Sequence, residues 1–369
     1  MNVAEKLILT AKESLDIMLT KMTSTKQEIE KKIIENKKLI DDNSAVTKTD
    51  FNKAEAYIKS RTLKYRGFNF HYGDSNWTPD LDRLYKIADE QIAIGSNSVS
   101  CVIYLYIDDE DWNFSLGCDI DNIKLISKYL YEHGVATTML KVHWLKGAIN
   151  KIDYNNIGSL FLTNLKTNVY DKLIPTLKEC GLEIANLTNE NPEATSINAS
   201  SKCKKLLSDL SAYLKGQGLK TTCCFVNPGE YTDADPALLD SLDVICLNDY
   251  TPVSYKGLNS TVEECTNFLI ERTSTNTMLK LVKDKPLIIS ETGCMDYVES
   301  LSSPAKWDYT EEQKVSSNGI IQNIFYTSWL NYLDAMQGKI MGVYFWDSTF
   351  SGFRPTENTK KTLTERWNV

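Results

Sequence analysis

The chain has 369 residues, of which 42% are hydrophobic and 24% are charged, and this composition excludes disordered and fibrous proteins. A net charge of −8 argues against nucleic acid as the main ligand, because neutralising phosphates requires clustered Lys and Arg residues. The length suffices for one barrel of about 250 residues with an additional segment.

Residues 1–60 differ in composition from the rest of the chain. They contain no Gly or Pro, and their apolar residues recur in steps of three and four, which predicts a helix with a heptad-like seam. We expect this segment to form a coiled coil and to make the protein a homo-oligomer. The alternative is a helix that packs on its own domain. The seam consists of Ile8, Ala11, Leu15, Met18, Met22, Ile29, Ile33 and Ile40, with Thr25 and Asn36 in core positions.

The amino terminus has no signal-peptide features, which are a basic start, an apolar core and a small-residue cleavage site. No stretch approaches about 18 uncharged apolar residues, so we expect no membrane span. These observations predict a cytoplasmic protein.

Residues 61–369 show short apolar runs that alternate with longer amphipathic stretches. This alternation is typical of a parallel sheet covered by helices, and it predicts an α/β fold of the TIM (β/α)8 barrel type. No repeat, low-complexity tract or Gly/Ser linker divides the region, so we expect one domain. The expected strands are residues 65–70, 98–106, 136–144, 182–188, 220–226, 244–247, 286–290 and 340–346.

Helices are expected between these strands. Gly follows several of the helical stretches and leads into a strand, as is typical of helix ends, because Gly adopts left-handed backbone conformations without strain. These glycines are Gly95, Gly134, Gly181 and Gly338. The expected helices are residues 81–94, 120–131, 157–178, 203–214, 262–282 and 311–335, with a short crossover at 236–242.

The cysteines and acidic residues do not form a recognisable metal site. Most of the nine cysteines, such as Cys101 and Cys246, lie in apolar runs, where a free thiol acts as a small hydrophobic group. No Cys/His spacing resembles a zinc site. The acidic run at residues 108–111 lacks the Gly and the spacing of a calcium loop. We predict no bound metal and no cofactor.

Two glutamates, Glu190 and Glu291, follow apolar strands at their carboxyl ends. The carboxyl ends of the strands in a parallel barrel surround one pocket, so we expect the two acids to converge there. A single Glu at such a position is more often a solvated charge. Two converging carboxylates, however, are the groups that cleave glycosides, since one protonates the leaving oxygen and the other attacks the anomeric carbon.

Three motifs at strand ends resemble those of clan A glycoside hydrolases: Asn189-Glu190, Ser290-Glu291-Thr-Gly and Tyr344-Phe-Trp346. Residues 65–346 most resemble the endo-β-mannanases of glycoside hydrolase family 113. The run Asn189-Glu-Asn-Pro192 is instead similar to the Asn-Glu-Pro of family 5. The resemblance implies a barrel in which Glu190 is the acid/base, Glu291 is the nucleophile and Trp346 is the floor of the sugar site.

Other residues at strand ends are candidates for substrate binding. Tyr250 can donate its hydroxyl to Glu291 and keep that carboxylate ionised, and Asn189 can bind a sugar 2-hydroxyl. Alternation along the strand predicts that Asp249 points away from the pocket. Aromatic faces stack on sugar rings, while His and Lys side chains offer donors. We therefore expect the pocket to be lined by His71, Lys141, His143, Trp144 and Trp346.

The sequence thus predicts a retaining β-glycoside hydrolase that acts in endo fashion on β-mannan or a related β-linked glycan. Its partner would be an oligosaccharide or polysaccharide. One alternative is a carbohydrate-binding barrel with little or no turnover. Another is a glycan-degrading attachment protein of a phage or other particle, because an oligomerising helix before a barrel suits such a protein.

Overall fold

A computed structural model describes residues 63–73, 79–107, 113–145, 159–282, 284–336, 338–347, 349 and 352–367. The predicted N-terminal helix and the acidic run at residues 108–111 lie outside this part of the chain. The coiled coil and the domain boundary near residue 60 therefore stay predictions.

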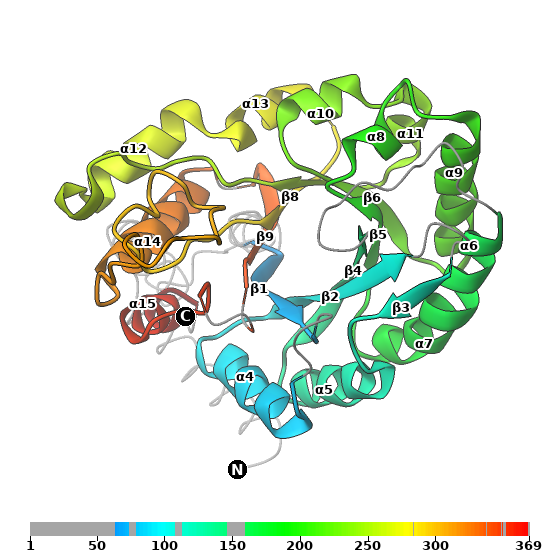
Figure 1. The fold of residues 1–369 in the computed structure, drawn as a ribbon, viewed down its shortest axis with the longest axis horizontal. Coiled ribbons are helices and arrows are strands. Elements are labelled where there is room, and N and C mark those ends of the chain that lie inside the picture. Colours follow the sequence, from blue (N-terminus) through cyan, green and yellow to red (C-terminus); the bar gives the residue numbers. More distant parts are fainter. Residues whose placement is uncertain are drawn as a thin grey trace, which may run out of the picture.

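Eight parallel strands close into a barrel (Figure 1). Pairing between β1 and β2 joins the two ends of the sheet, so the predicted TIM barrel is confirmed. A short strand, β3 (Phe114–Leu116), pairs antiparallel with the end of β2 and was not predicted. In the order of the ring, the barrel strands are β1 (Tyr65–His71), β9 (Ile340–Phe345), β8 (Leu287–Glu291), β7 (Ile245–Asn248), β6 (Lys220–Phe225), β5 (Ile184–Asn189), β4 (Ala136–Leu145) and β2 (Ser98–Ile107).

Helices surround this barrel (Figure 1). The four glycines predicted to end helices all have positive φ, between 75° and 92°, as expected. The helices are α4 (Leu81–Ala93), α5 (Ile120–Glu132), α6 (Ser159–Leu165), the π-helical η2 (Lys166–Tyr170), α7 (Asp171–Glu179), α8 (Pro192–Thr195), α9 (Ser201–Gly216), α10 (Pro228–Asp233), α11 (Pro236–Ser241), the 3-10 helix η3 (Gly257–Asn259), α12 (Val262–Arg272), α13 (Ser274–Leu281), α14 (Ile320–Ala335) and α15 (Glu357–Trp367).

Alternate residues of each strand face the barrel interior, where they form layers. The layer nearest the amino ends is apolar and includes Met139, Cys246 and Ile288. Lys141, Asn248 and Ser290 follow these three residues by two positions, and all three are buried. The interior therefore becomes polar toward the carboxyl ends of the strands.

The opposite face of each strand packs against the helices. Val99, Ile103 and Leu105 of β2 are fully buried in one core cluster with Ile126 of α5. Because both faces of the strands are covered, most of their residues are buried.

Several helical regions differ from the prediction, including the short helices α8, α10 and η3, which were not predicted. The expected helix at 311–335 begins only at Ile320, because Asn318 and Gly319 have positive φ and Asp296 accepts hydrogen bonds from the first turn. The stretch 262–282 is two helices, which are separated by the extended backbone of Thr273. The C-terminal helix α15 was not predicted.

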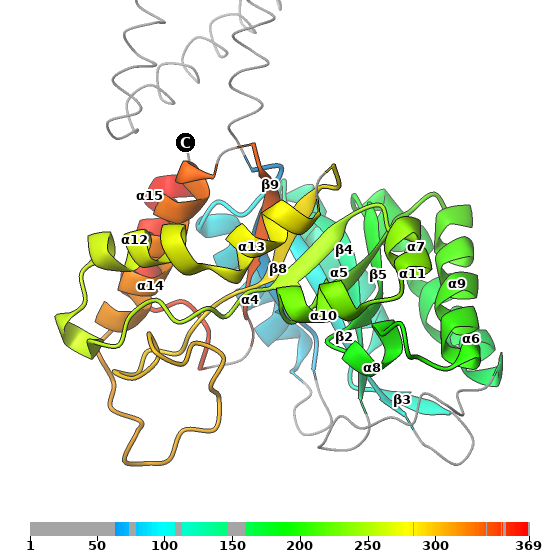
Figure 2. The same ribbon diagram turned by 90° about the horizontal axis from the view of Figure 1, so that it is seen from above.

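β3, α8, which follows β5, and the segment that follows β8 all lie on one side of the barrel in the turned view (Figure 2). This is the side of the carboxyl ends, where sites lie in parallel barrels. Among the described residues, no helix is long and apolar enough to cross a membrane.

Candidate active site

Glu190 and Glu291 lie at the carboxyl ends of two strands, as predicted. Glu291 is the last residue of β8, and Glu190 directly follows β5. Their surroundings differ, because the Glu291 side chain is 5% exposed whereas Glu190 is solvent-exposed. The site thus holds one buried and one accessible carboxyl group.

Glu291 is held by a buried lysine. The ammonium group of Lys141 on β4 contacts Oε1 of Glu291 and donates to the backbone oxygen of Ser290 at 3.2 Å. The side chain of Lys141 is fully buried, and its ammonium group lies 5.8 Å from the centre of the Trp346 ring. A buried charge requires such partners, since an unpaired ammonium loses its hydration without compensation.

Tyr250 donates its hydroxyl to Oε2 of Glu291 at 3.0 Å, which is the hydrogen bond expected from the sequence. Burial raises the pKa of Glu291 to about 7, the Lys141 ammonium lowers it, and the negative charge of Glu190 raises it. The predicted donor Tyr250 is therefore present and Lys141 adds an ammonium group that was predicted only to line the pocket, yet burial outweighs both. The expectation that donors alone would hold the free carboxyl group ionised did not account for this burial.

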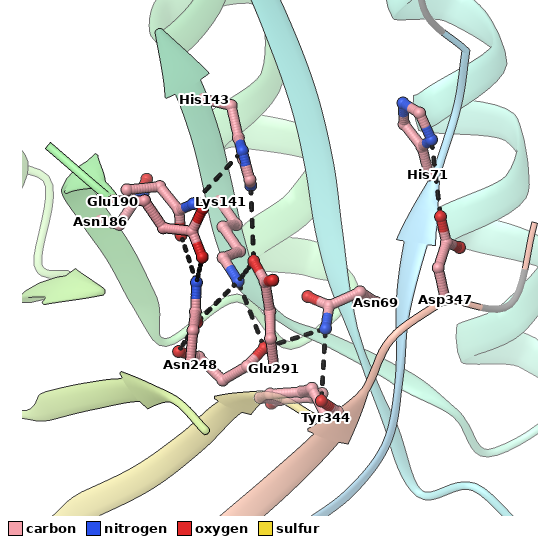
Figure 3. Close-up of polar contacts among 12 residues, drawn as sticks. Asn69, His71, Lys141, His143, Asn186, Glu190, Asn248, Glu291, Tyr344 and Asp347 are labelled. Atoms are coloured by element: carbon pink, nitrogen blue, oxygen red, sulfur yellow. Dashed lines mark hydrogen bonds and ion pairs between the residues drawn. The ribbon is translucent and has the colours of Figure 1, made fainter. Parts of the chain in front are cut away.

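Asn248 at the end of β7 connects the two glutamates (Figure 3). Its amide donates to Oε1 of Glu190 at 2.7 Å, while its oxygen accepts from Ser290 Oγ at 2.7 Å and faces Lys141 Nζ at 3.4 Å. One side chain therefore links the exposed carboxyl group to the cation that holds the buried one. Asn248 was not predicted as a site residue.

Asn189 and His143 lie next to this network. The Asn189 amide donates to Nδ1 of His143 at 3.2 Å, and Nε2 of His143 lies 3.7 Å from Oε1 of Glu291. Burial lowers the pKa of His143 well below its ordinary value, and the charge of Lys141 lowers it further. The imidazole is therefore neutral with its proton on Nε2, which points toward Glu291.

Trp346 lies at the barrel mouth after β9, with its ring 6.1 Å from that of His143. It packs against a small cluster formed by Met295, Tyr309 and Phe353. Gly293 permits this position, because a Cβ atom there would lie 2.3 Å from the backbone oxygen of Trp346. The Glu-Thr-Gly motif thus fits the close approach of two chain segments.

His71 lies inside the barrel mouth, and its ring is edge-on to that of Tyr104 at 4.5 Å. Trp144 does not face the glutamates, and the prediction that it lines the pocket is wrong. Its ring packs edge-on against Phe161 of α6 at 5.2 Å in the core between strand and helices. His143 points inward, so its neighbour on the strand points outward.

Asp249 faces away from the site, as predicted, and accepts hydrogen bonds from the backbone of Thr251 and Thr275. Besides Asn248, three residues at the barrel mouth were not predicted: Asn69, Tyr104 and Asp347. Asn69 donates to the backbone oxygen of Ser290 at 2.9 Å. Ile103 and Leu105 pack in the core outside the barrel, so alternation along β2 was a signal that Tyr104 faces inward.

Comparisons with known proteins agree with this architecture. No family model and no curated protein matches the sequence. Among solved structures, a GH113 β-1,4-mannanase superposes with a TM-score of 0.60 and 14% identity over 84% of this chain and 100% of that chain. The GH113 β-mannanase of Alicyclobacillus acidocaldarius has a TM-score of 0.58 and 13% identity over 83% and 99%.

A GH5_18 protein of Bifidobacterium longum subsp. infantis has a TM-score of 0.53 and 14% identity, over 82% of this chain and 78% of that chain. The chain shares the fold of these glycoside hydrolases. The resemblance to clan A, and to family 113 in particular, is thus confirmed at the level of the fold.

Proposed function

We propose that the protein is a retaining β-glycoside hydrolase in which Glu291 is the nucleophile and Glu190 is the acid/base. The observation that carries this proposal is the pair of carboxyl groups on β5 and β8, joined through Asn248 and Lys141. Lys141 and Tyr250 hold Glu291 at the barrel mouth, and the exposed Glu190 can exchange protons with water. The shared barrel fold supports the proposal, since glycoside hydrolases place such acids at these strand ends.

The first step is attack by a carboxylate oxygen of Glu291 on the anomeric carbon. The bond from that carbon to the glycosidic oxygen breaks as Glu190 transfers its proton to the oxygen. Lys141 and Tyr250 hold Glu291 in position and stabilise its ionised form. In the second step, Glu190 removes a proton from water, and this water attacks the anomeric carbon. The bond from that carbon to Glu291 breaks, and the sugar is released with its original anomeric configuration.

The accessibility of Glu190 fits this second step. A residue that activates water must be reached by water, and Glu190 is exposed whereas Glu291 is not. The Asn248 amide orients the Glu190 carboxyl group without removing it from solvent. A barrel that only bound carbohydrate would need Trp346. It would not need two acids, one held by Lys141 and Tyr250 and the other by Asn248.

The substrate we propose is a β-mannan or a related β-linked glycan, cleaved in endo fashion. The fold shared with two GH113 β-mannanases supports this choice. A panel of manno-, gluco- and N-acetyl-oligosaccharides tests it by product analysis. Manno-oligosaccharides should be cleaved internally, and cleavage confined to another sugar series would contradict the proposed substrate.

The roles of the two acids can be separated by leaving-group chemistry. An activated aryl leaving group needs no proton, so Glu190→Ala should keep glycosylation of an aryl glycoside while losing about 10²- to 10⁴-fold on a natural glycan. Azide should rescue this variant and give a glycosyl azide of retained configuration. Glu291→Ala should be inactive on every substrate.

Glu193→Ala is the matched control, because Glu193 is an exposed glutamate on α8 only three residues from Glu190. This variant should retain the activity of the parent protein. Parental rates from Glu291→Ala on a natural glycan would contradict the mechanism and favour the carbohydrate-binding alternative.

A further inference from the structure

The barrel mouth contains a third carboxylate, Asp347, that the proposed mechanism does not use. Asp347 follows Trp346 and is fully buried. Its Oδ1 accepts hydrogen bonds from the backbone nitrogen and the hydroxyl of Thr349, at 2.7 and 2.8 Å. Its Oδ2 has no hydrogen-bond partner among the residues that the structure describes.

Nδ1 of His71 lies 3.6 Å from Oδ2, which is longer than a hydrogen bond. A buried carboxylate oxygen without a donor loses hydration and gains nothing in return. A ligand hydroxyl that donates to Oδ2 would remove this cost. The two oxygens of Asp347 therefore differ, since one accepts hydrogen bonds within a turn and the other has no donor among the described residues.

A row of three rings connects Asp347 with Glu291, because His71 lies beside Asp347 and His143 lies beside Glu291. The ring of Tyr104 is edge-on to His71 at 4.5 Å and edge-on to His143 at 4.9 Å, so the three rings form one wall. Burial raises the pKa of Tyr104, and the charges of Asp347, Glu291 and Glu190 raise it further. Figure 3 shows the pair of His71 and Asp347 beside β1, apart from the network around the glutamates.

The position of the glutamates orients a bound sugar. The anomeric carbon must lie at Glu291 and the glycosidic oxygen at Glu190. A sugar whose ring stacked on Trp346 would direct its remote edge, which carries the C-4 and C-6 substituents, toward Asp347, the next residue in the chain.

We propose that Asp347 is a specificity-determining residue that accepts a hydroxyl from the remote edge of the sugar bound beside Glu291. This inference rests on the proposed glycosidase function. It assigns the substrate to neutral hexosides and excludes uronides, because a uronide would place its carboxylate against that of Asp347. Lys141 cannot compensate, since its ammonium group is engaged by Glu291.

The test compares aryl β-hexosides with their 4-deoxy and 6-deoxy analogues and with the corresponding uronides, using the full-length protein. The parent protein should cleave at least one hexoside with a kcat/KM at least 100-fold above that of its uronide. One of the two deoxy analogues should be cleaved at least tenfold less well than the hexoside. This comparison needs no variant, so it remains informative if a substitution impairs folding.

Asp347→Asn keeps an oxygen for Thr349 but removes the charge. It should lower kcat/KM for the hexoside at least tenfold and change that for the sensitive deoxy analogue less than threefold. Asp249→Asn is the matched control, because Asp249 is also buried after a strand but faces away from the site. That control should leave the ratios among the substrates unchanged.

Two outcomes would overturn the inference while leaving the glycosidase function intact. One is a parent protein that cleaves both deoxy analogues as well as the hexoside. The other is an Asp347→Asn variant that either loses the same factor of kcat/KM on every substrate or keeps the parental kcat/KM on every substrate. Failure of the parent protein to cleave any glycoside would instead contradict the proposed function, and this inference with it.

Discussion

At the scale of single residues, the site residues that could be predicted from the sequence are those whose role depends only on their position at the end of a strand. The hydrogen bond from Tyr250 to Glu291 was predicted because both residues end neighbouring strands. The error at Trp144 has a simple cause, since adjacent residues of a strand cannot both face the pocket. The same alternation correctly predicted that the side chain of Asp249 points away from the pocket.

Asn248 could not be found in this way. Its role comes from two contacts, with Glu190 on one strand and Lys141 on another, and these depend on the register between strands. A single sequence does not fix that register. The burial that raises the pKa of Glu291 is likewise a property of the assembled barrel.

Lys141→Met should change the pH dependence of catalysis. The nucleophile must be ionised, so kcat/KM should rise with pH through the pKa of Glu291, near 7 in the parent protein. Removing the ammonium removes the group that lowers this pKa, so the rising limb should move to higher pH by about one unit or more. A kcat/KM profile from pH 5 to 9 measures the shift.

Lys285→Met is the control for this prediction, because Lys285 is a partly buried lysine that donates to the backbone of Leu239 and Leu242, outside the site. Its rising limb should match that of the parent protein. An unshifted limb in Lys141→Met would show that the lysine does not support the ionised nucleophile.

At the scale of elements, the eight barrel strands were predictable because buried parallel strands are continuously apolar and end at turn residues. Boundaries set by tertiary contacts were not predictable. The start of α14 depends on Asp296, which lies 23 residues away from Gly319 in the chain. The break between α12 and α13 depends on the hydrogen bond from Thr273 to Asp249.

Glu230 illustrates an element contact with a measurable consequence. It lies on α10, is 7% exposed, and accepts hydrogen bonds from Val226 after β6 and from Thr195 on α8. Burial raises its pKa from 4.5 to about 7. The native state therefore retains a proton that the unfolded state releases, so this group lowers stability as pH rises from about 4.5 to 7 and above.

Glu230→Gln should remove this loss, because an amide can keep the hydrogen bond from Val226 without a charge. Its unfolding free energy relative to the parent protein should rise between pH 5 and pH 8 by about 2–3 kcal/mol. Urea unfolding at both pH values measures this difference. Glu193→Gln, at an exposed position, should show no such trend. Parallel curves for Glu230→Gln and the parent would refute the assignment.

At the scale of the whole molecule, the barrel closes within the described residues. β1 begins at Tyr65 and pairs with both β2 and β9, so no strand from residues 1–60 is needed to complete the ring. The composition of those residues predicts a separate role in association. Catalysis and assembly should therefore be separable.

A protein of residues 61–369 should retain kcat/KM within about twofold of the full-length chain. Its mass in solution, measured by light scattering, should fall to that of a monomer, since the predicted seam is absent. Equal oligomeric states with and without residues 1–60 would remove the coiled-coil prediction. Loss of the folded state would contradict the domain boundary near residue 60.

The central claim is that Glu291 forms a covalent bond with the sugar, and trapping that bond tests it most directly. A 2-deoxy-2-fluoro glycosyl fluoride of a cleaved sugar should inactivate the protein and add one glycosyl unit, because the fluorine slows hydrolysis of the intermediate more than its formation. Peptide mass spectrometry should locate the added unit on Glu291. A label on Glu190, or turnover with inverted configuration and no label, would contradict the account.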